Sequence, residues 1–255
     1  RRAHAYIGAQ AATGYDISPA AEWLLDNFHV IDSQLLAIHE GLPRSYFRAL
    51  PVLQAEPLAG LPRIYGLAWA WVAHTDSGLD EELLEQFLSA YQSQRELTLA
   101  ELWAVPTTLR VVLVENLRRL AERAATLQAA RDAAHRWVER VPQAGDPQEL
   151  EAMGELLARR GVLEPFALTV QRRCEEFASE VAPGVRQWLA RHLPDPAGAL
   201  QRQQQQQAED HQSVRNAVTT LRGLDEVDWR GVLLRSSAAV ADLRQLPVFA
   251  AEAEA

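Results

Sequence analysis

The chain has 255 residues, of which 48% are hydrophobic and 23% are charged, a composition that is typical of folded globular proteins and excludes global disorder. Its net charge of −9 argues against nucleic-acid binding, which needs clustered positive charge, and against docking on anionic lipid through a basic surface. A single cysteine, Cys174, excludes an internal disulfide and a cysteine-based zinc site. Because no run of about 18 uncharged apolar residues is present, we also expect no membrane-spanning helix.

The first predicted helix covers residues 19–40. Apolar residues recur there at spacings of three and four, which places them on one face of a helix: Leu24, Phe28, Ile31, Leu35 and Ile38. Ser18 is a suitable N-cap, and Gly41 supplies the C-terminal stop.

The next segment, residues 42–62, is interrupted by four prolines and a glycine: Pro43, Pro51, Pro57, Gly60 and Pro62. This pattern predicts a proline-rich loop with one helical turn near residues 45–50. A loop of this length is uncommon in a compact domain, so we expect it to be either functional or packed across a surface.

Helical periodicity returns after the loop. Helices are expected at residues 64–74 and 80–92, and Thr98 and Glu101 then form a capping box that opens a long helix to about residue 128. Pro106 lies inside this run and should kink the helix or reset its start. A further helix is expected at 129–141.

The strongest helix breaker is the segment 142–147, where two prolines flank a glycine. It suggests an N-terminal helical subdomain, 1–141, and a C-terminal one, 148–255, unless both form one continuous helical domain. Expected helices beyond it cover 147–160, 165–181, 184–192, 196–222 and 229–246. The glutamine run at 201–207 predicts an exposed helical face. With no alternating strand pattern, we predict an all-α fold, an irregular bundle or stack of antiparallel helix hairpins without significant sheet.

The common catalytic and nucleotide-binding motifs are missing from the sequence, so no catalytic residue and no metal ligand is predicted. Asp26, His29 and Asp32 share one face of the first helix, and a carboxylate–histidine pair can serve acid–base chemistry. An ordinary ion pair on a polar helix face explains the same spacing.

An aromatic segment gives the best candidate for contact with a glycan or with another domain: Tyr65, Trp69, Trp71, His74 and Asp76. Aromatic faces stack on sugars, and a nearby carboxylate accepts hydrogen bonds from hydroxyl groups. Core packing remains open, because aromatic residues at i and i+4 also pack against one another inside a bundle.

Two further sets of residues have simple structural interpretations. Five tryptophans are spread about one per helix and predict packing between helices: Trp23, Trp103, Trp137, Trp188 and Trp229. Three arginines predict a solvated face paired with Glu115 and Glu122, with binding of a sugar-nucleotide phosphate as the alternative: Arg110, Arg118 and Arg119.

Several stretches together resemble one family. They are SPAAEWLLDNFHV at 18–30, LPRSYFRALP at 42–51, GLPRIYGLAWA at 60–70, VAHTDS at 72–77, ELWAVPTTLR at 101–110, VENLRRL at 114–120, NAVTTLR at 216–222 and DWR at 228–230. They resemble the N-terminal cytoplasmic region of cyclic β-1,2-glucan synthases, which are large inner-membrane proteins of Gram-negative bacteria.

The resemblance implies a role within a larger enzyme. In the family, a membrane-embedded glycosyltransferase domain polymerises glucose from UDP-glucose, and a phosphorylase-like domain controls chain length. No Asp-x-Asp motif is present in the chain, so the resemblance implies a non-catalytic region on the cytoplasmic side of the inner membrane, with scaffolding or glucan-guiding functions. The implied partners are these two domains of the same polypeptide and β-1,2-glucan. Nucleic acid, direct membrane insertion and a cofactor are not expected.

Two alternatives stay open at this point. The chain could be an independent helical glycan-processing enzyme, using either the Asp26–His29–Asp32 face or the aromatic segment. It could also be a helical oligomerisation module with the apolar stripe of residues 24–38 as a dimer seam.

Overall fold

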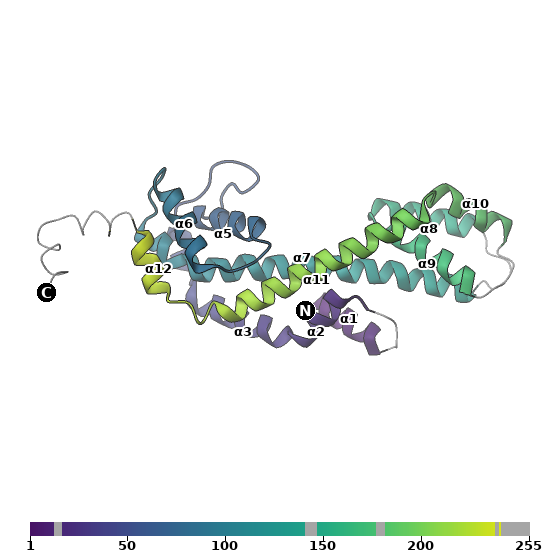
Figure 1. The fold of residues 1–255 in the computed structure, drawn as a ribbon, viewed down its shortest axis with the longest axis horizontal. Coiled ribbons are helices and arrows are strands. Elements are labelled where there is room, and N and C mark those ends of the chain that lie inside the picture. Colours follow the sequence, from purple (N-terminus) through teal and green to yellow (C-terminus); the bar gives the residue numbers. More distant parts are fainter. Residues whose placement is uncertain (13–16, 141–146, 177–181, 238–239, 241–255) are drawn as a thin grey trace, which may run out of the picture. The chain divides into compact units, whose positions relative to one another are not determined.

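The structure is a computed structural model and describes residues 1–12, 17–140, 147–176, 182–237 and 240. These residues form twelve helices and no strand, so the predicted all-α class is confirmed. The described part contains one isolated β-bridge, between Val52 and Pro62, which closes the proline-rich loop. Figure 1 shows the path of the chain through the helices.

Contacts divide the chain into two compact units, each built from two separate stretches of sequence. The first unit contains Arg1–Asp26 and Arg119–Gln212, and the second contains Asn27–Arg118 and Ser213–Ala255. This division interleaves the sequence, whereas the sequence pattern suggested a single cut at 142–147, of which residues 141–146 lie outside the described residues. The interleaving arises because two long helices, α7 (Leu99–Arg140) and α11 (Pro196–Gly223), contribute residues to both units.

The first unit consists of short helices around parts of the two long ones. It includes α1 (Arg2–Ala12), α2 (Pro19–Asp26), α8 (Pro147–Arg159), α9 (Leu163–Glu176) and α10 (Pro183–His192), with residues 119–140 of α7 and 196–212 of α11. Its apolar core includes Trp137, Phe166 and Trp188, the last two in edge-to-face contact with ring centroids 6.1 Å apart. A Cβ atom on Gly154 would lie 2.9 Å from the Trp188 ring, so the approach of α8 to α10 requires glycine there.

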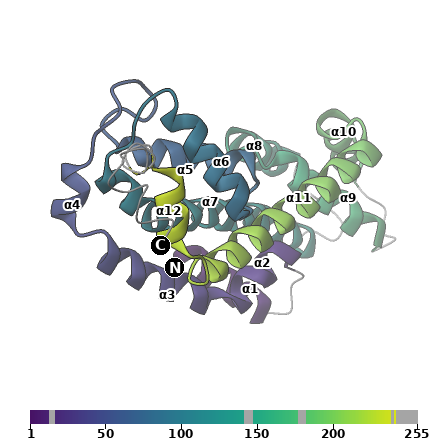
Figure 2. The ribbon, with the colours of Figure 1, turned by 60° about the vertical axis from the view of Figure 1, so that its left-hand side comes forward.

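The second unit contains the elements on which the predicted site depends. They are α3 (Phe28–Gly41), α4 (Arg44–Ala49), α5 (Arg63–His74), α6 (Glu81–Gln92) and α12 (Trp229–Ser236), with residues 99–118 of α7 and 213–223 of α11. The core includes Ile64, Leu84, Leu102 and Leu113, each no more than 1% exposed. Helices α6 and α12 pack together, as Figure 2 shows.

Several local predictions are confirmed and others are corrected. Ser18 caps α2 by accepting a hydrogen bond from the Ala21 amide at 3.3 Å, and α4 is the predicted turn in the proline-rich loop. The helix expected at 19–40 is interrupted at Asn27, whose side-chain oxygen accepts a hydrogen bond from Arg222 at 2.6 Å. The continuous seam required by the oligomerisation alternative is therefore interrupted too.

The long helix and the C-terminal elements also differ from expectation. The two helices expected at 99–128 and 129–141 form one helix, α7, which continues through Pro106 because the i–4 hydrogen bond lost there is one of many along 42 residues. The last predicted helix, 229–246, is shorter than expected: α12 ends at Ser236 and the backbone of Ser237 is extended, while residues 238–239 and 241–246 lie outside the described residues. The predicted helix at 165–181 corresponds to α9, with residues 177–181 outside the described residues.

A buried ion pair joins the start of α5 to the start of α7. Arg63 donates from Nε to Oε1 of Glu101 at 2.8 Å and from Nη2 to Oε2 at 2.6 Å, and Nη2 also donates to the Glu96 carbonyl at 2.9 Å. Arg63 is 8% exposed and Glu101 is fully buried. Glu101 also closes the predicted capping box, since it accepts from the Thr98 amide at 2.9 Å while its own amide donates to the Thr98 hydroxyl at 3.2 Å.

The ionisation of this pair is stabilised by its hydrogen bonds. Burial alone raises the pKa of the Glu101 carboxyl, but hydrogen bonds from Arg63 and Thr98 together with the charge of Arg63 outweigh burial and lower the pKa below its ordinary value. The hydrogen bond to Glu101 raises the pKa of the Arg63 guanidinium. Both groups are therefore charged in the folded protein at neutral pH.

Replacing Glu101→Gln should destabilise the second unit by about 3–5 kcal/mol, because it leaves the buried Arg63 guanidinium without its counter-charge. Denaturant unfolding of the chain measures this loss. Glu96→Gln is the matched control, since the Glu96 side chain is exposed and only its backbone carbonyl contacts Arg63. Equal stability of the two variants would contradict a structural role for the buried pair.

The same pair should make the protein sensitive to acid. Because the folded-state pKa of Glu101 is lowered, its carboxylate contributes stability above the pKa that it has in the unfolded chain, and this contribution is lost as the pH falls through the folded-state pKa. We expect the unfolding free energy to decrease below about pH 4.3, the ordinary pKa of glutamate. Thermal unfolding at a series of pH values should show a shallower acid dependence for Glu101→Gln, and identical slopes would argue against this assignment.

Candidate functional site

Two of the five residues predicted to form the site lie together on α5. The rings of Tyr65 and Trp69 are stacked, with centroids 6.4 Å apart and planes at 23°, and both side chains are partly exposed. This is the arrangement that the i, i+4 spacing predicts. The two rings therefore form one aromatic pair on α5.

Trp71 lies on a different face of α5. Two helical positions rotate the side-chain direction by roughly 200°, so Trp71 is directed away from Trp69 and into the core. It is 4% exposed and packs against Phe87 of α6, with ring centroids 5.6 Å apart. For Trp71, the structure agrees with the core-packing interpretation.

His74 and Asp76 lie at the end of α5, where both side chains are exposed. Asp76 has a positive φ of 47° and is held by α11: its carboxylate accepts hydrogen bonds from Ser213 at 2.6 Å and from Asn216 at 3.1 Å. The next residue, Ser77, is buried with a φ of 66°, and its carbonyl accepts a hydrogen bond from Thr220 at 2.6 Å. The Asp76 carboxylate and the Ser77 carbonyl therefore secure the α5–α6 turn to α11.

The other polar candidates are also engaged in structural contacts. Arg110 donates to Gln34 at 2.8 Å and forms an ion pair with Asp225, so it joins α7 to α3 and to the residues after α11 instead of facing Glu115. Arg118 forms the predicted ion pair with Glu115 at 2.7 Å.

An apolar surface near the start of α7 was not anticipated. Leu99 is 57% exposed and Trp103 is 54% exposed, and the two residues are one helical turn apart. The prediction that Trp103 packs between helices is therefore wrong. The sequence does not mark Trp103 as exposed, because its apolar neighbours Leu102 and Ala104 are both buried and an apolar run predicts burial for all three.

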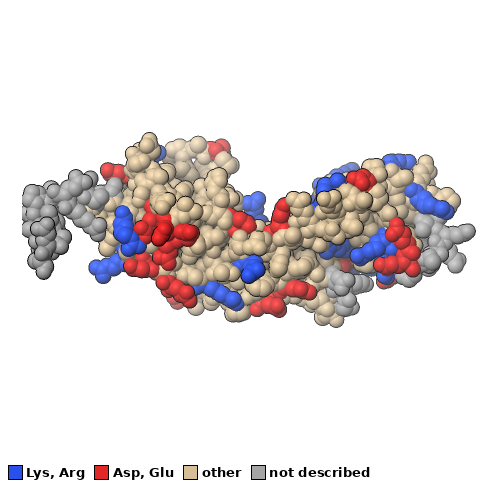
Figure 3. Space-filling view, in the orientation of Figure 1, with Lys and Arg blue, Asp and Glu red and all other residues tan. Residues whose placement is uncertain are grey.

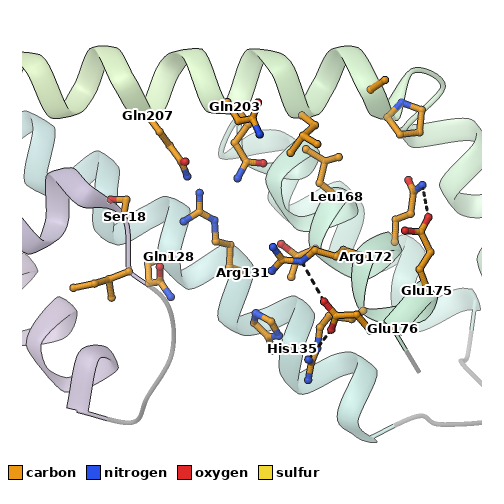
Figure 4. Close-up of a pocket in the computed structure, with 18 of the residues that line it drawn as sticks. Ser18, Gln128, Arg131, His135, Leu168, Arg172, Glu175, Glu176, Gln203 and Gln207 are labelled. Atoms are coloured by element: carbon orange, nitrogen blue, oxygen red, sulfur yellow. Dashed lines mark hydrogen bonds and ion pairs between the residues drawn. The ribbon is translucent and has the colours of Figure 1, made fainter. Parts of the chain in front are cut away.

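A groove of about 800 Å³ lies within the first unit, between α7, α9, α11 and the start of α2. Its polar lining includes Ser18, Gln128, Arg131, Arg172, Gln203 and Gln207. Figure 4 shows Arg131 extending from α7 toward Gln207 on α11. The glutamine run was predicted to form an exposed face, but Gln203 and Gln207, one turn apart, are partly buried against this groove.

The groove holds an excess of positive charge near Arg131. Burial lowers the pKa of Arg131, and the charge of Arg172 lowers it further, while Asp132 opposes this shift. Burial also lowers the pKa of His135 on the next turn, with additional repulsion from Arg173 and Arg172. At the other side of the groove, Glu176 pairs with Arg173 at 2.9 Å and with Arg172 at 3.8 Å.

The charged side chains of the described residues do not form a metal site. No group of three or more His, Cys, Asp and Glu residues that could hold an ion is present in that part of the chain. None of its helices combines the length and the hydropathy needed to cross a bilayer. On the face in Figure 3, acidic and basic side chains are interspersed and no continuous basic patch is visible.

Comparison with known proteins gives one informative relative, and no protein-family model matches the chain. The chain is 31% identical over 231 residues to the cyclic β-(1,2)-glucan synthase NdvB of Rhizobium meliloti (strain 1021). The match covers 89% of the chain but only 8% of the length of that relative. The resemblance seen in the sequence is thereby confirmed, and the chain corresponds to one segment of a cyclic β-(1,2)-glucan synthase.

Proposed function

We propose that the chain is a non-catalytic accessory region of a membrane-bound cyclic β-1,2-glucan synthase, an enzyme that polymerises glucose from UDP-glucose. The region acts at the cytoplasmic side of the bacterial inner membrane, near the N-terminus of the enzyme, and requires no cofactor. It docks on another domain of the same polypeptide, either the glycosyltransferase or the phosphorylase-like domain. The contact is made by the α7 docking surface, which we define as Leu99 and Trp103.

The observation that carries this proposal is the exposure of Trp103. An indole ring that is 54% exposed beside an exposed leucine leaves apolar area in water, and tryptophan is among the residues that contribute most to protein interfaces. The segment matches only 8% of the length of NdvB, so a protein of that kind carries a large amount of additional chain that can cover this surface. An intramolecular partner also has a high effective concentration, so a small apolar contact suffices.

The contacts made by the polar candidates support a role without catalysis. Asp76 is engaged in holding the α5–α6 turn, and Arg110 is engaged with Gln34 and Asp225. General acid–base catalysis needs a group within hydrogen-bond reach of a substrate, and these side chains already have protein partners.

Trp103→Ser in the full-length synthase should reduce β-1,2-glucan formation from UDP-glucose several-fold, because it removes the apolar anchor of the docking surface. The thermal stability of the 255-residue chain should change little, since the residue is exposed. Leu83→Ser is a matched control, because Leu83 is 48% exposed on α6 in the same unit. Unchanged glucan output from Trp103→Ser would rule out docking through this surface.

Two further measurements test the two alternatives to docking. If light scattering shows that the chain is a dimer which Trp103→Ser converts to a monomer, the surface joins two copies and the oligomerisation module replaces our proposal. If the isolated chain cleaves β-1,2-glucan, it is an enzyme in its own right.

The stacked Tyr65–Trp69 pair supports a second element of the proposal, which is contact with the growing glucan. Both rings are partly exposed and nearly parallel, and aromatic rings are side chains that stack on sugar rings. His74 lies on the same helix and is exposed, so the proposed contact with glucan uses Tyr65, Trp69 and His74, while Asp76 holds the α5–α6 turn. Trp71 packs in the core of the second unit and does not contact the glucan.

A pair of variants tests the glucan contact. Trp69→Ala should leave the chain folded and weaken its binding of linear β-1,2-glucan, whereas Trp71→Ala should cost about 3–5 kcal/mol of stability because it leaves a cavity in the core. Calorimetric titration with the oligosaccharide and denaturant unfolding measure the two effects. Glucan binding by Trp69→Ala that equals the unmodified chain would remove this element of the proposal.

A further inference from the structure

Arg131 is a partly buried cation that forms no ion pair in the described part of the chain, although the negative charge of Asp132 acts on it. Among the described residues, no hydrogen bond or ion pair engages its guanidinium. More exposed arginines of the same unit are paired: Arg140 with Glu149 at 3.0 Å and Arg202 with Glu164 at 2.9 Å. Withdrawing a charge from water without compensation is unfavourable, so an unpaired arginine inside a groove indicates a missing anionic partner.

The surroundings of Arg131 favour an anion and not a further cation. Arg172, which also pairs with Glu176 at 3.8 Å, adds a second positive charge. The side-chain amides of Gln203 and Gln207 supply hydrogen-bond donors from α11. The first residues of α2 and α11, Pro19 and Pro196, also line the groove, and the N-terminal end of a helix carries a partial positive charge. Several independent sources of positive potential therefore meet in one place.

The size and lining of the groove narrow the class of ligand. Its volume of about 800 Å³ is that of a small-molecule site and exceeds what one phosphate needs. A guanidinium recognises a phosphate group through two parallel hydrogen bonds, and amide and hydroxyl side chains suit a polyhydroxylated body. No Trp, Tyr or Phe side chain is among the described residues lining the groove, so stacking on a neutral sugar is not what it provides.

We propose that this groove binds a phosphate ester with a polyhydroxylated moiety, a sugar phosphate or a nucleotide sugar, and that Arg131 contacts the phosphate. Arg172 adds charge at the site, while Gln203 and Gln207 hydrogen-bond the remainder of the ligand. The site lies wholly within the first unit, whereas the α7 docking surface lies in the second, so the two proposals stand or fall separately.

The test is calorimetric titration of the 255-residue chain with inorganic pyrophosphate, glucose 1-phosphate, UDP-glucose and a neutral β-1,2-gluco-oligosaccharide. We expect saturable binding of at least one phosphate compound, at least tenfold weaker in Arg131→Gln. Arg159→Gln is the matched control, because it removes the same charge from an exposed position at the end of α8 in the same unit. It should bind as the unmodified chain does.

Comparison of the affinities for the different phosphate compounds identifies the chemical class of the ligand. Tighter binding of UDP-glucose than of pyrophosphate assigns a nucleotide sugar to the groove, and tighter binding of glucose 1-phosphate assigns a sugar phosphate. If no phosphate compound binds, the proposal fails. It also fails if Arg131→Gln binds as well as the unmodified chain, or if Arg159→Gln weakens binding equally.

A stability measurement keeps the test independent of folding defects. Without ligand, Arg131→Gln should have a Tm equal to or above that of the unmodified chain, because it relieves the burial of a charge and its repulsion by Arg172. The phosphate ligand should raise the Tm of the unmodified chain and not that of the variant. Gln207→Ala, which keeps every charge, should weaken binding by a smaller factor than Arg131→Gln does. If the ligand raises the Tm of both variants as much as it raises that of the unmodified chain, the assignment is overturned.

Discussion

The second unit depends on the buried pair of Arg63 and Glu101. Three short segments meet at this pair: the first turn of α5, the first turn of α7 and the carbonyl of Glu96 between α6 and α7. Each charged group stabilises the fold only because the other is present, since an isolated charge at either position would be buried without compensation. Glu101 adds a second constraint by closing the capping box with Thr98, so the start of α7 and its attachment to α5 are fixed by one side chain.

With α7 fixed in this way, the surroundings of the aromatic segment follow. Beyond the other end of α5, the α5–α6 turn is held by Ser213 and Asn216, which donate hydrogen bonds to Asp76. Between these two attachments α5 has a buried face with Trp71 and a partly exposed face with Tyr65 and Trp69. Polar contacts at both ends of one helix thus fix the position of the two stacked rings.

The described part of the first unit is stabilised mainly by apolar packing and not by a buried ion pair. Its core is apolar, with Trp137, Phe166 and Trp188 at the centre, and its ion pairs lie mostly on exposed surfaces where each contributes little. The groove beside this core is the exception, because it keeps charge partly away from water. A structure that stabilises itself by apolar packing has no evident need for Arg131 in that position, which is why a ligand-binding role explains it better than a structural one.

Much of the local structure was determined by the sequence alone. The caps at Ser18 and Thr98, the Tyr65–Trp69 spacing and the helical class depend on residues within a few positions of one another, so periodicity and capping rules suffice to predict them. Only the tertiary structure decided that Glu101 pairs with Arg63 across 38 residues, that Trp71 is buried while Trp103 is exposed, and that Arg131 lies in a groove. Helical spacing specifies which residues share a face, but the face that becomes buried is decided by elements distant in sequence. For that reason the family segment could be recognised from its residues, whereas its candidate binding groove could not.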